Sequence, residues 1–105
     1  MANLKKGFVH TVFFWLKDKD NQADHQALHE GLLELSKIDL IQTAYVGTPA
    51  NTNRAVIDFT YQFSITWIFD TAEQQAAYQT HPDHLAFVTK CSHLWEKVQV
   101  YDAES

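Results

Sequence analysis

The chain opens with a segment in which apolar residues occupy both alternating sets of positions. Residues 7–17, GFVHTVFFWLK, therefore predict a strand with two largely apolar faces. The set that is expected to face the helices is Phe8, His10, Val12, Phe14 and Leu16. The opposite set, which is expected to face a dimer partner, is Val9, Thr11, Phe13 and Trp15. A strand of this kind needs cover on both sides.

A helical period follows this strand. Leu28, Leu32 and Leu35 are spaced i, i+4 and i+7, which predicts an amphipathic helix within residues 18–38. Asp20 and Asn21 are the candidates for its N-cap, because their side chains can accept a hydrogen bond from the first turn.

Two further strands are predicted over residues 39–47 and 59–69, with a turn-rich loop between them. Alternation in the second of them places one apolar set on a common face: Tyr61, Phe63, Ile65, Trp67 and Phe69. A helix is then expected from Asp70, which resembles the cap of a capping box with Glu73, to about Thr80. The helix should stop there because a proline disfavours helical angles in the residue before it.

Pro82 suits the first turn of another helix. The predicted inward face of this helix carries His84, Phe87, Val88, Cys91, Leu94 and Trp95. A short last strand is expected over residues 96–102, with Val98 and Val100 on one side.

The order strand, helix, strand, strand, helix, strand predicts one α+β domain over residues 1–105, a ferredoxin-like four-stranded antiparallel sheet with helices on one face. The helices can cover only one face of this sheet. We therefore expect a second copy to cover the other face, sheet against sheet, in a two-fold homodimer that forms a dimeric α/β barrel.

Charge and cysteine content narrow the classes of partner. A net charge of −5 disfavours nucleic acid and anionic membranes, because phosphate binding needs a basic surface. The single cysteine, Cys91, excludes an internal disulfide and fits a reducing compartment. No signal peptide and no bilayer-spanning run is expected, so the predicted location is the cytoplasm.

Four stretches carry a family resemblance: HTVFFWLK, YVGTPA, FSITWIFDTAEQQAAYQTHPDHLAFV and LWEKVQVYD. Through them the chain resembles the stress-responsive α/β-barrel (Dabb) family from about Phe8 to Asp102. The most specific pieces are the His-Pro-x-His element, preceded by a tyrosine, and the histidine early in the first strand. The resemblance implies a ferredoxin-like fold and a dimeric β-barrel made from two sheets. Members include plant stress-associated proteins and a polyketide cyclase, olivetolic acid cyclase.

The resemblance to the cyclase also implies roles for single residues. The histidine that acts as its base falls on His84, and the tyrosine that assists falls on Tyr78. The strand-one histidine that lines its pocket falls on His10. A further pocket histidine of the cyclase falls on Phe63, a departure that would make this pocket more apolar.

The same residues also have structural interpretations. His84 and Tyr78 could exchange protons with a keto substrate near neutral pH, or could pin the junction between two helices. His81, before Pro82, is expected to cap or hinge the helix beside the pocket and to contact a ligand there. His10 could be a hydrogen-bonded core histidine or could face the same cavity as His84. No metal ligand set and no cofactor is expected, since a third ligand beside His81 and His84 is not evident.

Three functions stay open at this point. The first is a homodimeric stress-responsive domain of undefined biochemical role, which binds a small apolar or keto ligand or has no defined chemistry. The second is a polyketide-cyclase-like or lyase-like enzyme with His84 as general base and Tyr78 assisting. The third, by analogy of fold alone, is a haem or metal binder.

Overall fold

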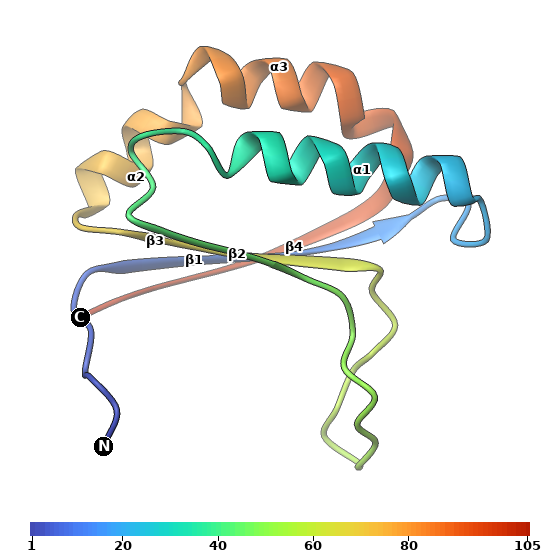
Figure 1. Ribbon diagram of the computed structural model, residues 1–105, viewed down its shortest axis with the longest axis horizontal. Helices are drawn as coiled ribbons and strands as arrows, with labels where there is room; N and C mark the ends of the chain where they lie inside the picture. The colour runs from blue at the N-terminus through green and yellow to red at the C-terminus, as the bar shows by residue number, and fades with distance from the viewer.

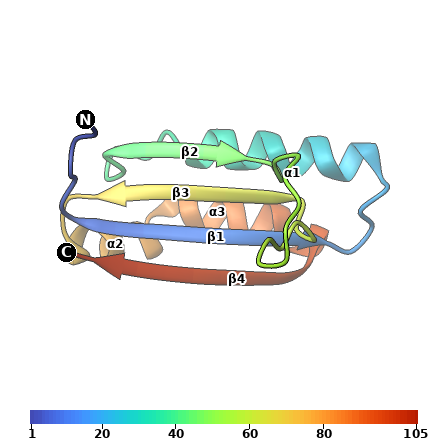
Figure 2. The same cartoon turned by 90° about the horizontal axis from the view of Figure 1, so that it is seen from below.

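A computed structural model describes all 105 residues of the chain. The elements in chain order are β1 (Phe8–Leu16), α1 (Gln22–Leu35), β2 (Thr43–Gly47), β3 (Phe63–Phe69), α2 (Ala72–Gln79), α3 (Pro82–Cys91), a 3₁₀ turn η1 (Ser92–Leu94) and β4 (Trp95–Glu104). The strands form one antiparallel sheet in the order β2-β3-β1-β4 (Figure 2). All helices lie on one face of this sheet (Figure 1), so the predicted ferredoxin-like α+β fold is confirmed.

The core lies between the helices and the helix-facing side of β1 and β3. Burial alternates along both strands as predicted, and the buried set on β1 is His10, Val12, Phe14 and Leu16. The buried set on β3 is Phe63, Ile65, Trp67 and Phe69. The predicted leucine stripe Leu28, Leu32 and Leu35 packs α1 onto them. Each such apolar side chain contributes about 1.5–3 kcal/mol on burial.

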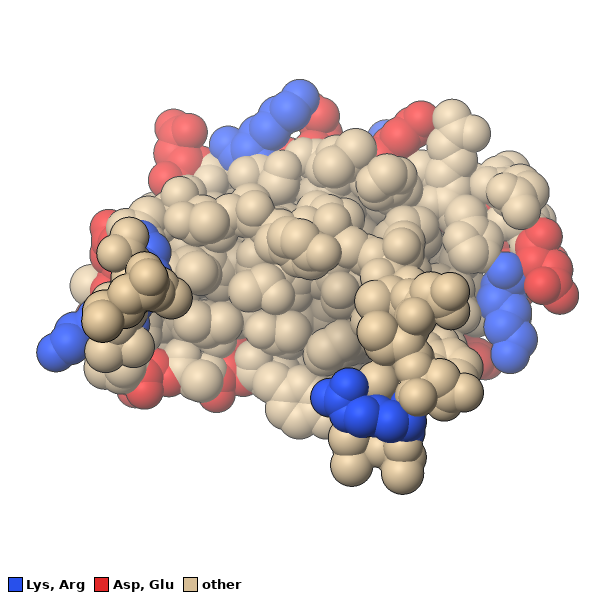
Figure 3. Space-filling view, turned by 60° about the horizontal axis from the view of Figure 1, so that its bottom comes forward, with Lys and Arg blue, Asp and Glu red and all other residues tan.

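The opposite face of the sheet, which we call the outer face, is covered by no helix (Figure 1). Its side chains on the two central strands are half-buried rather than exposed: Val9, Thr11, Phe13, Trp15, Ser64, Thr66 and Ile68. The loop of residues 48–62 projects on this side. Lys, Arg, Asp and Glu side chains gather around the margin of this side of the molecule and leave its centre uncharged (Figure 3).

Two strand predictions were too long at their N-terminal ends. Residues 39–42 form a turn in which the Ile41 N–H donates to the Ile38 carbonyl over 3.0 Å, so their apolar side chains close the end of the core instead of alternating. Residues 59–62 precede β3, and Tyr61 does not share the face of Phe63. The Tyr61 ring packs on Phe13 of the outer face, with ring centroids 4.8 Å apart.

The helix caps require one correction. Asn21 is the N-cap of α1, as expected. The N-cap of α2 is Thr71 and not Asp70, because the Thr71 side chain accepts from the Gln74 N–H while the Gln74 side chain accepts from the Asp70 N–H. The predicted cap was one residue too early, because the side chain that accepts a hydrogen bond from the backbone before the helix is that of Gln74 and not that of Glu73.

The predicted inward face of α3 was too long. The helix ends at Cys91, and Trp95 is already extended at the start of β4, although its ring still stacks on Phe87 at 5.7 Å between centroids. Val88 is 38% exposed because β4 lies at the sheet edge, beyond the cover of α3. None of the helices in the fold has the length and apolar character that crossing a membrane requires.

Candidate functional site

Three neighbouring strands place a row of polar side chains across the helix-facing side of the sheet. His10 of β1 is the cross-strand partner of Trp67 on β3 and of Asp102 on β4. Tyr78 of α2 packs against this row, with its ring centroid 5.9 Å from that of His10. His84 of α3 lies next to Tyr78, at 4.7 Å between ring centroids. We call these five residues the His–Tyr cluster.

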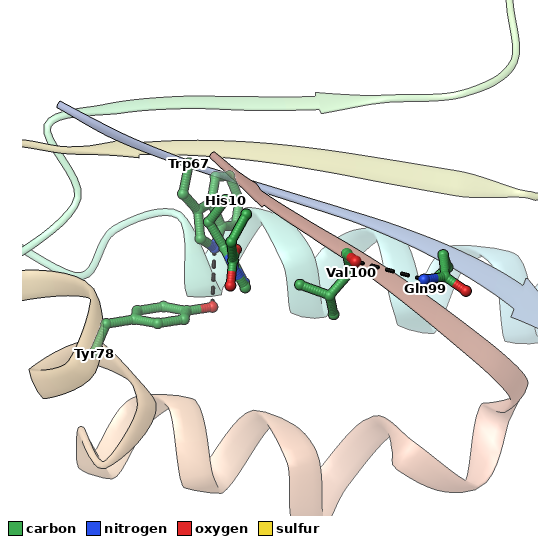
Figure 4. A network of polar contacts seen from close by, with 6 residues as sticks. His10, Trp67, Tyr78, Gln99 and Val100 are labelled. Atoms are coloured by element: carbon green, nitrogen blue, oxygen red, sulfur yellow. Dashed lines mark hydrogen bonds and ion pairs between the residues drawn. The ribbon is translucent and has the colours of Figure 1, made fainter. Parts of the chain in front are cut away.

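The hydroxyl of Tyr78 is held inside the core. The Nε1–H of Trp67 donates to it over 2.9 Å, as Figure 4 shows. Because an indole can only donate, this bond uses an acceptor position and leaves the Tyr78 O–H free to donate to another group. Burial raises the pKa of Tyr78 to about 12, against the opposing effect of the Trp67 bond, so the hydroxyl stays protonated near neutral pH.

His84 is oriented by its own helix junction. Its Nδ1 lies 3.1 Å from the Gln79 carbonyl, which can only accept, so the Nδ1–H donates and Nε2 carries the lone pair of the neutral ring. Burial lowers the pKa of His84, and the neighbouring His10 and His81 rings lower it further, while the bond to Gln79 opposes them. A histidine with a lowered pKa and a free Nε2 can accept a proton at neutral pH.

His10 forms a close pair with Asp102. The Nδ1 atom lies 2.6 Å from Asp102 Oδ1, and the side chain of Asp102 is 40% exposed whereas that of His10 is 6% exposed. Because an ionised carboxylate only accepts, His10 donates through Nδ1 and its Nε2 is left on the other side of the ring. The pair links the buried part of the cluster to the surface at the β4 edge.

The break between α2 and α3 brings Tyr78 and His84 together. The helix α2 ends at Gln79, and α3 begins at Pro82 with His81 as its N-cap. The His81 Nδ1 accepts from the Asp83 N–H over 3.0 Å, so the predicted capping role of His81 is confirmed. The chain therefore turns between two residues that are six positions apart, and the turn puts both on the sheet side.

The strip of β4 beside the cluster has no helix over it. Val98 and Val100 share the helix-facing side with Asp102 and are 41% and 43% exposed. In Figure 4 the Val100 side chain points to the same side of β4 as the Tyr78 hydroxyl. A cavity between α1 and α3 and a smaller one on the outer face do not include Tyr78, His84 or His10. The cluster thus adjoins an apolar edge of the sheet that is open to solvent.

The structure brings together three of the five residues singled out from the sequence, His10, Tyr78 and His84. His81 caps α3 nearby. Phe63 lies elsewhere, because it pairs with Phe14, four residues along β3 from Trp67, which is roughly 13 Å at the rise of a strand. Its buried ring stacks on His29, an exposed residue of α1, at 5.5 Å between centroids, so its part in ligand binding remains a prediction.

Two members of the cluster were not singled out. The sequence places Trp67 only in the apolar set on one face of its strand, and it indicates no role for Asp102. The signal for Trp67 was its place on the buried face of β3, where an indole N–H needs a partner. Asp102 belongs to the cluster only through the register of β4 against β1, which residue spacing does not determine.

The side chains of the chain do not form a cluster of metal ligands. No group of three or more His, Cys, Asp or Glu residues lies close enough to hold a metal ion. Cys91 is buried, and burial raises the pKa of its thiol, which fits its predicted role as a small apolar side chain.

Fold and cluster together define a ferredoxin-like α+β protein in which the His–Tyr cluster lies between the sheet and the helices α2 and α3. The sequence profile of the stress-responsive A/B barrel domain family, Dabb, matches residues 8–105, and the chain belongs to this family. Among curated proteins, none is significantly similar to the chain in sequence.

Solved structures with the same fold include proteins from bacteria and plants. A Dabb family protein from Mesorhizobium loti is 22% identical, with a TM-score of 0.76 over 96% of this chain and 98% of its own. A dimeric ferredoxin-like protein of unknown function from Thermobifida fusca is 19% identical, with a TM-score of 0.77 over 100% and 99%. A hydroxynitrile lyase from Passiflora edulis is 18% identical, with a TM-score of 0.76 over 96% and 95%. At these identities the likeness is one of fold.

Proposed function

We propose that this Dabb protein is a homodimeric, cofactor-independent acid–base catalyst that acts on a small carbonyl compound. The observation that carries the proposal is the pairing of His84 with Tyr78: a histidine with a free Nε2 and a lowered pKa lies 4.7 Å, between ring centroids, from a tyrosine whose O–H is free to donate.

The two groups have complementary roles in this mechanism. His84 Nε2 takes a proton from the carbon next to the substrate carbonyl. The electron pair of that C–H bond forms the C=C bond of the enolate, and the π electrons of the carbonyl move onto its oxygen. The Tyr78 O–H donates a hydrogen bond to that oxygen as its negative charge develops. The enolate then either takes the proton back from His84 or attacks a second carbonyl in an aldol-type cyclisation, in which case the new alkoxide takes that proton. In both cases the imidazole returns to its neutral form.

The His10–Asp102 pair supplies a second polar group at the same place. His10 Nε2 lies on the side away from Asp102, and its ring is 5.9 Å from that of Tyr78 between centroids. The apolar strip of Val98 and Val100 offers a surface for the body of an apolar or keto substrate. The likeness to a hydroxynitrile lyase adds lyase chemistry to the reactions worth testing, because cleaving such a compound also needs a base.

The homodimer is supported by the outer face. Its half-buried side chains include Phe13, Trp15 and Ile68, and no helix covers them. An apolar sheet face of this kind calls for a second layer, and a second copy packed sheet to sheet provides one. Similar structures from Thermobifida fusca and Bacteroides fragilis are described as dimeric.

A second candidate function is a homodimeric binding domain without chemistry. It is favoured by one observation, the complete burial of Tyr78, whose hydroxyl is already bonded to the Trp67 N–H inside the core. In that case Trp67, Tyr78 and His84 would only pin α2 and α3 to the sheet.

Proton abstraction distinguishes the two candidates directly. The purified protein is incubated in D₂O with a β-keto acid, a β-diketone and a small aliphatic ketone, and deuterium incorporation next to the carbonyl is followed by NMR. A cyanohydrin is tested in parallel for release of its aldehyde. We expect an accelerated reaction with at least one probe, a loss of about 10²-fold in His84→Gln and a smaller loss in Tyr78→Phe.

His93→Gln is the matched control, because His93 is an exposed histidine in η1 outside the cluster. Rates equal to those of buffer with every probe, or equal losses in His84→Gln and His93→Gln, would overturn the catalytic proposal and leave the binding domain.

A further inference from the structure

The edge of the sheet beside the His–Tyr cluster is bordered by two carboxylates. Paired residues of neighbouring strands share one face, so Asp102 lies on the helix-facing side of β4 beside His10. Glu104 lies on the same side, beside Phe8. As a diagonal neighbour of His10, Glu104 has its Cβ about 7–8 Å from that of the histidine. The side chain of Asp102 is 40% exposed and Glu104 is exposed as well, so both charges face the solvent from which a substrate would come.

The basic side chains of the protein lie on other surfaces. The eight are Lys5, Lys6, Lys17, Lys19, Lys37, Arg54, Lys90 and Lys97. Only Lys90 and Lys97 belong to elements that carry the cluster. Lys97 of β4 is on the outer face, with its Nζ 4.5 Å from the centre of the Trp15 ring. Lys90 of α3 lines the cavity between α1 and α3, and His84 does not.

The other six basic residues lie in segments between or before the helices and strands. Those nearest to His10 in sequence belong to the N-terminal segment, which runs toward the β2 edge of the sheet (Figure 2). There the Lys5 Nζ donates to the Gln42 side chain over 3.2 Å. Because β2 and β4 are opposite edges of the sheet, this charge lies away from the two carboxylates. A carboxylate on a substrate therefore has no basic partner at the cluster.

Hydrogen-bond donors that could hold an anion at this edge are also in use. The His10 Nδ1–H is bonded to Asp102. The N-terminus of α3 could otherwise attract an anion, but it begins with Pro82, which has no N–H. The N–H of the next residue, Asp83, is bonded to the His81 ring, and the Asp83 carboxylate adds a negative charge there. The edge is thus unsuited to an anion in its donors as well as in its charge.

We infer that the substrate is an uncharged carbonyl compound, and that Glu104 is a specificity-determining residue that disfavours keto acids. Val98 and Val100 can contact an uncharged body, but they would remove water from a carboxylate without replacing its hydrogen bonds. The carboxylates of the edge would repel it in addition. Because it concerns what His84 and Tyr78 act on, this specificity rests on the proposed function. Neither carboxylate lies on the outer face, which the second copy of the homodimer is proposed to cover.

The test compares methyl levulinate with levulinate, which share one keto group and differ chiefly in charge. The full chain is titrated with each compound at neutral pH, and the NMR signal of the Trp67 Nε1–H, which is bonded to the Tyr78 oxygen, is followed. We expect a millimolar dissociation constant for the ester and a value about tenfold higher for the acid, because each of the two exposed carboxylates should contribute about two- to fivefold. In about 1 M salt the Debye length falls to about 3 Å, and the difference should shrink to about twofold or less.

Substitutions of Glu104 separate the effect of charge from that of size. Glu104→Gln should strengthen the binding of levulinate about two- to fivefold and leave that of the ester unchanged. Glu104→Lys reverses the charge and should bring the acid to about the affinity of the ester. Glu96→Gln is the matched control, because Glu96 is an exposed carboxylate near the other end of the same strand, roughly 26 Å from Glu104 at the rise of a strand. It should leave both dissociation constants unchanged.

Equal affinities for the two compounds, tighter binding of levulinate, or failure of the ester to bind would overturn the inference. The same holds if Glu104→Gln behaves like Glu96→Gln or if the difference persists in high salt. Deuterium incorporation next to the keto group, measured on the same samples, distinguishes this result from the proposed catalysis. Preference for the ester without exchange supports the specificity and removes the catalysis, whereas exchange with equal affinities removes the specificity alone.

Discussion

Trp67 and Tyr78 are joined by a hydrogen bond of 2.9 Å between the indole N–H and the phenol oxygen, and both side chains are almost completely buried. One comes from the centre of the sheet and the other from α2. The bond therefore positions the tyrosine that is expected to donate to a substrate. It also gives the buried indole N–H the hydrogen-bond acceptor that such a group needs.

Removing either end of this bond should destabilise the protein. Tyr78→Phe leaves the Trp67 N–H buried without a partner, which costs about 1–3 kcal/mol of unfolding free energy. Trp67→Phe loses the same bond and adds a cavity cost. In urea denaturation the double variant should lose less than the sum of the two single losses, with a coupling of about 1 kcal/mol. Strict additivity would show that the bond contributes nothing to stability.

The lowered pKa of His84 predicts a pH dependence with a definite sign. The unfolded chain has the ordinary value of 6.5 at this position and binds the proton first as the pH falls. The stability that the neutral buried ring contributes is therefore complete above pH 6.5, and it is lost as the pH falls through the folded-state pKa.

Unfolding free energies measured from pH 7.5 to pH 5 should show this decline in the wild type and less of it in His84→Gln. The His84 ring resonances should titrate below pH 6.5 in an NMR experiment. Titration above pH 6.5 would contradict the idea that burial dominates the environment of His84, and would also weaken its case as a base.

Much of this arrangement could be predicted from residue patterns, and the reason is physical. The alternation in β1 and β3 and the leucine stripe of α1 report burial, and burial decides the layers of the fold. Pro82 predicts a helix break after Thr80, because a proline disfavours helical backbone angles in the residue before it, here His81. The alternation placed His10, and the helical spacing after Pro82 placed His84, on the side between sheet and helices. Tyr78 was singled out only through the family resemblance.

The features that could not be predicted depend on the pairing register of the strands, on where each strand begins, and on the order of the strands in the sheet. Asp102 meets His10 only because β4 pairs with β1 in one register out of several that alternate equally well. Tyr61 leaves the predicted face because the chain before Phe63 is not yet pleated, and the pattern of apolar residues does not mark that change. Val98 and Val100 are exposed because β4 is an edge strand of the sheet. The spacing of residues along the chain does not determine the order of the strands, so this exposure could not be predicted.

The close contact between α1 and α3 leaves little room for a side chain at Gly31. A Cβ at this position would lie 2.8 Å from the Cys91 Sγ and 3.2 Å from the Phe87 ring. Gly31→Ala should therefore destabilise the protein by up to about 2 kcal/mol, because an overpacking cost of about 1–3 kcal/mol is reduced by a helix-propensity gain of about 1 kcal/mol.

The partner substitution tests this explanation. Cys91→Ala removes the sulfur, so Gly31→Ala should cost less in that background than in the wild type. Ala27→Gly, at an exposed position of the same helix, measures the propensity effect alone. If Gly31→Ala stabilises the protein by the amount that Ala27→Gly destabilises it, the two helices have more room than the structure indicates.

The uncovered outer face predicts the assembly of the protein and the substitution that should break it. Ile68 lies on this face between Val9 of β1 and Thr43 of β2, and it is half-buried already in the single chain. A second copy packed on the sheet would bury it further. Ile68→Lys would then leave an unpaired ammonium between two sheets, at a cost of several kcal/mol. At about 1.4 kcal/mol per tenfold, the dissociation constant of the dimer should rise by at least about a hundredfold.

Size-exclusion chromatography with light scattering at micromolar concentration should give the mass of a dimer for the wild type and of a monomer for Ile68→Lys, with an unchanged circular dichroism spectrum. Leu33→Lys is the control, since Leu33 is 45% exposed on α1 and the same charge there should leave the dimer intact. A monomeric wild type would mean that the outer face tolerates water, and an equal loss of dimer in both variants would place the interface on the helices instead of on the sheet.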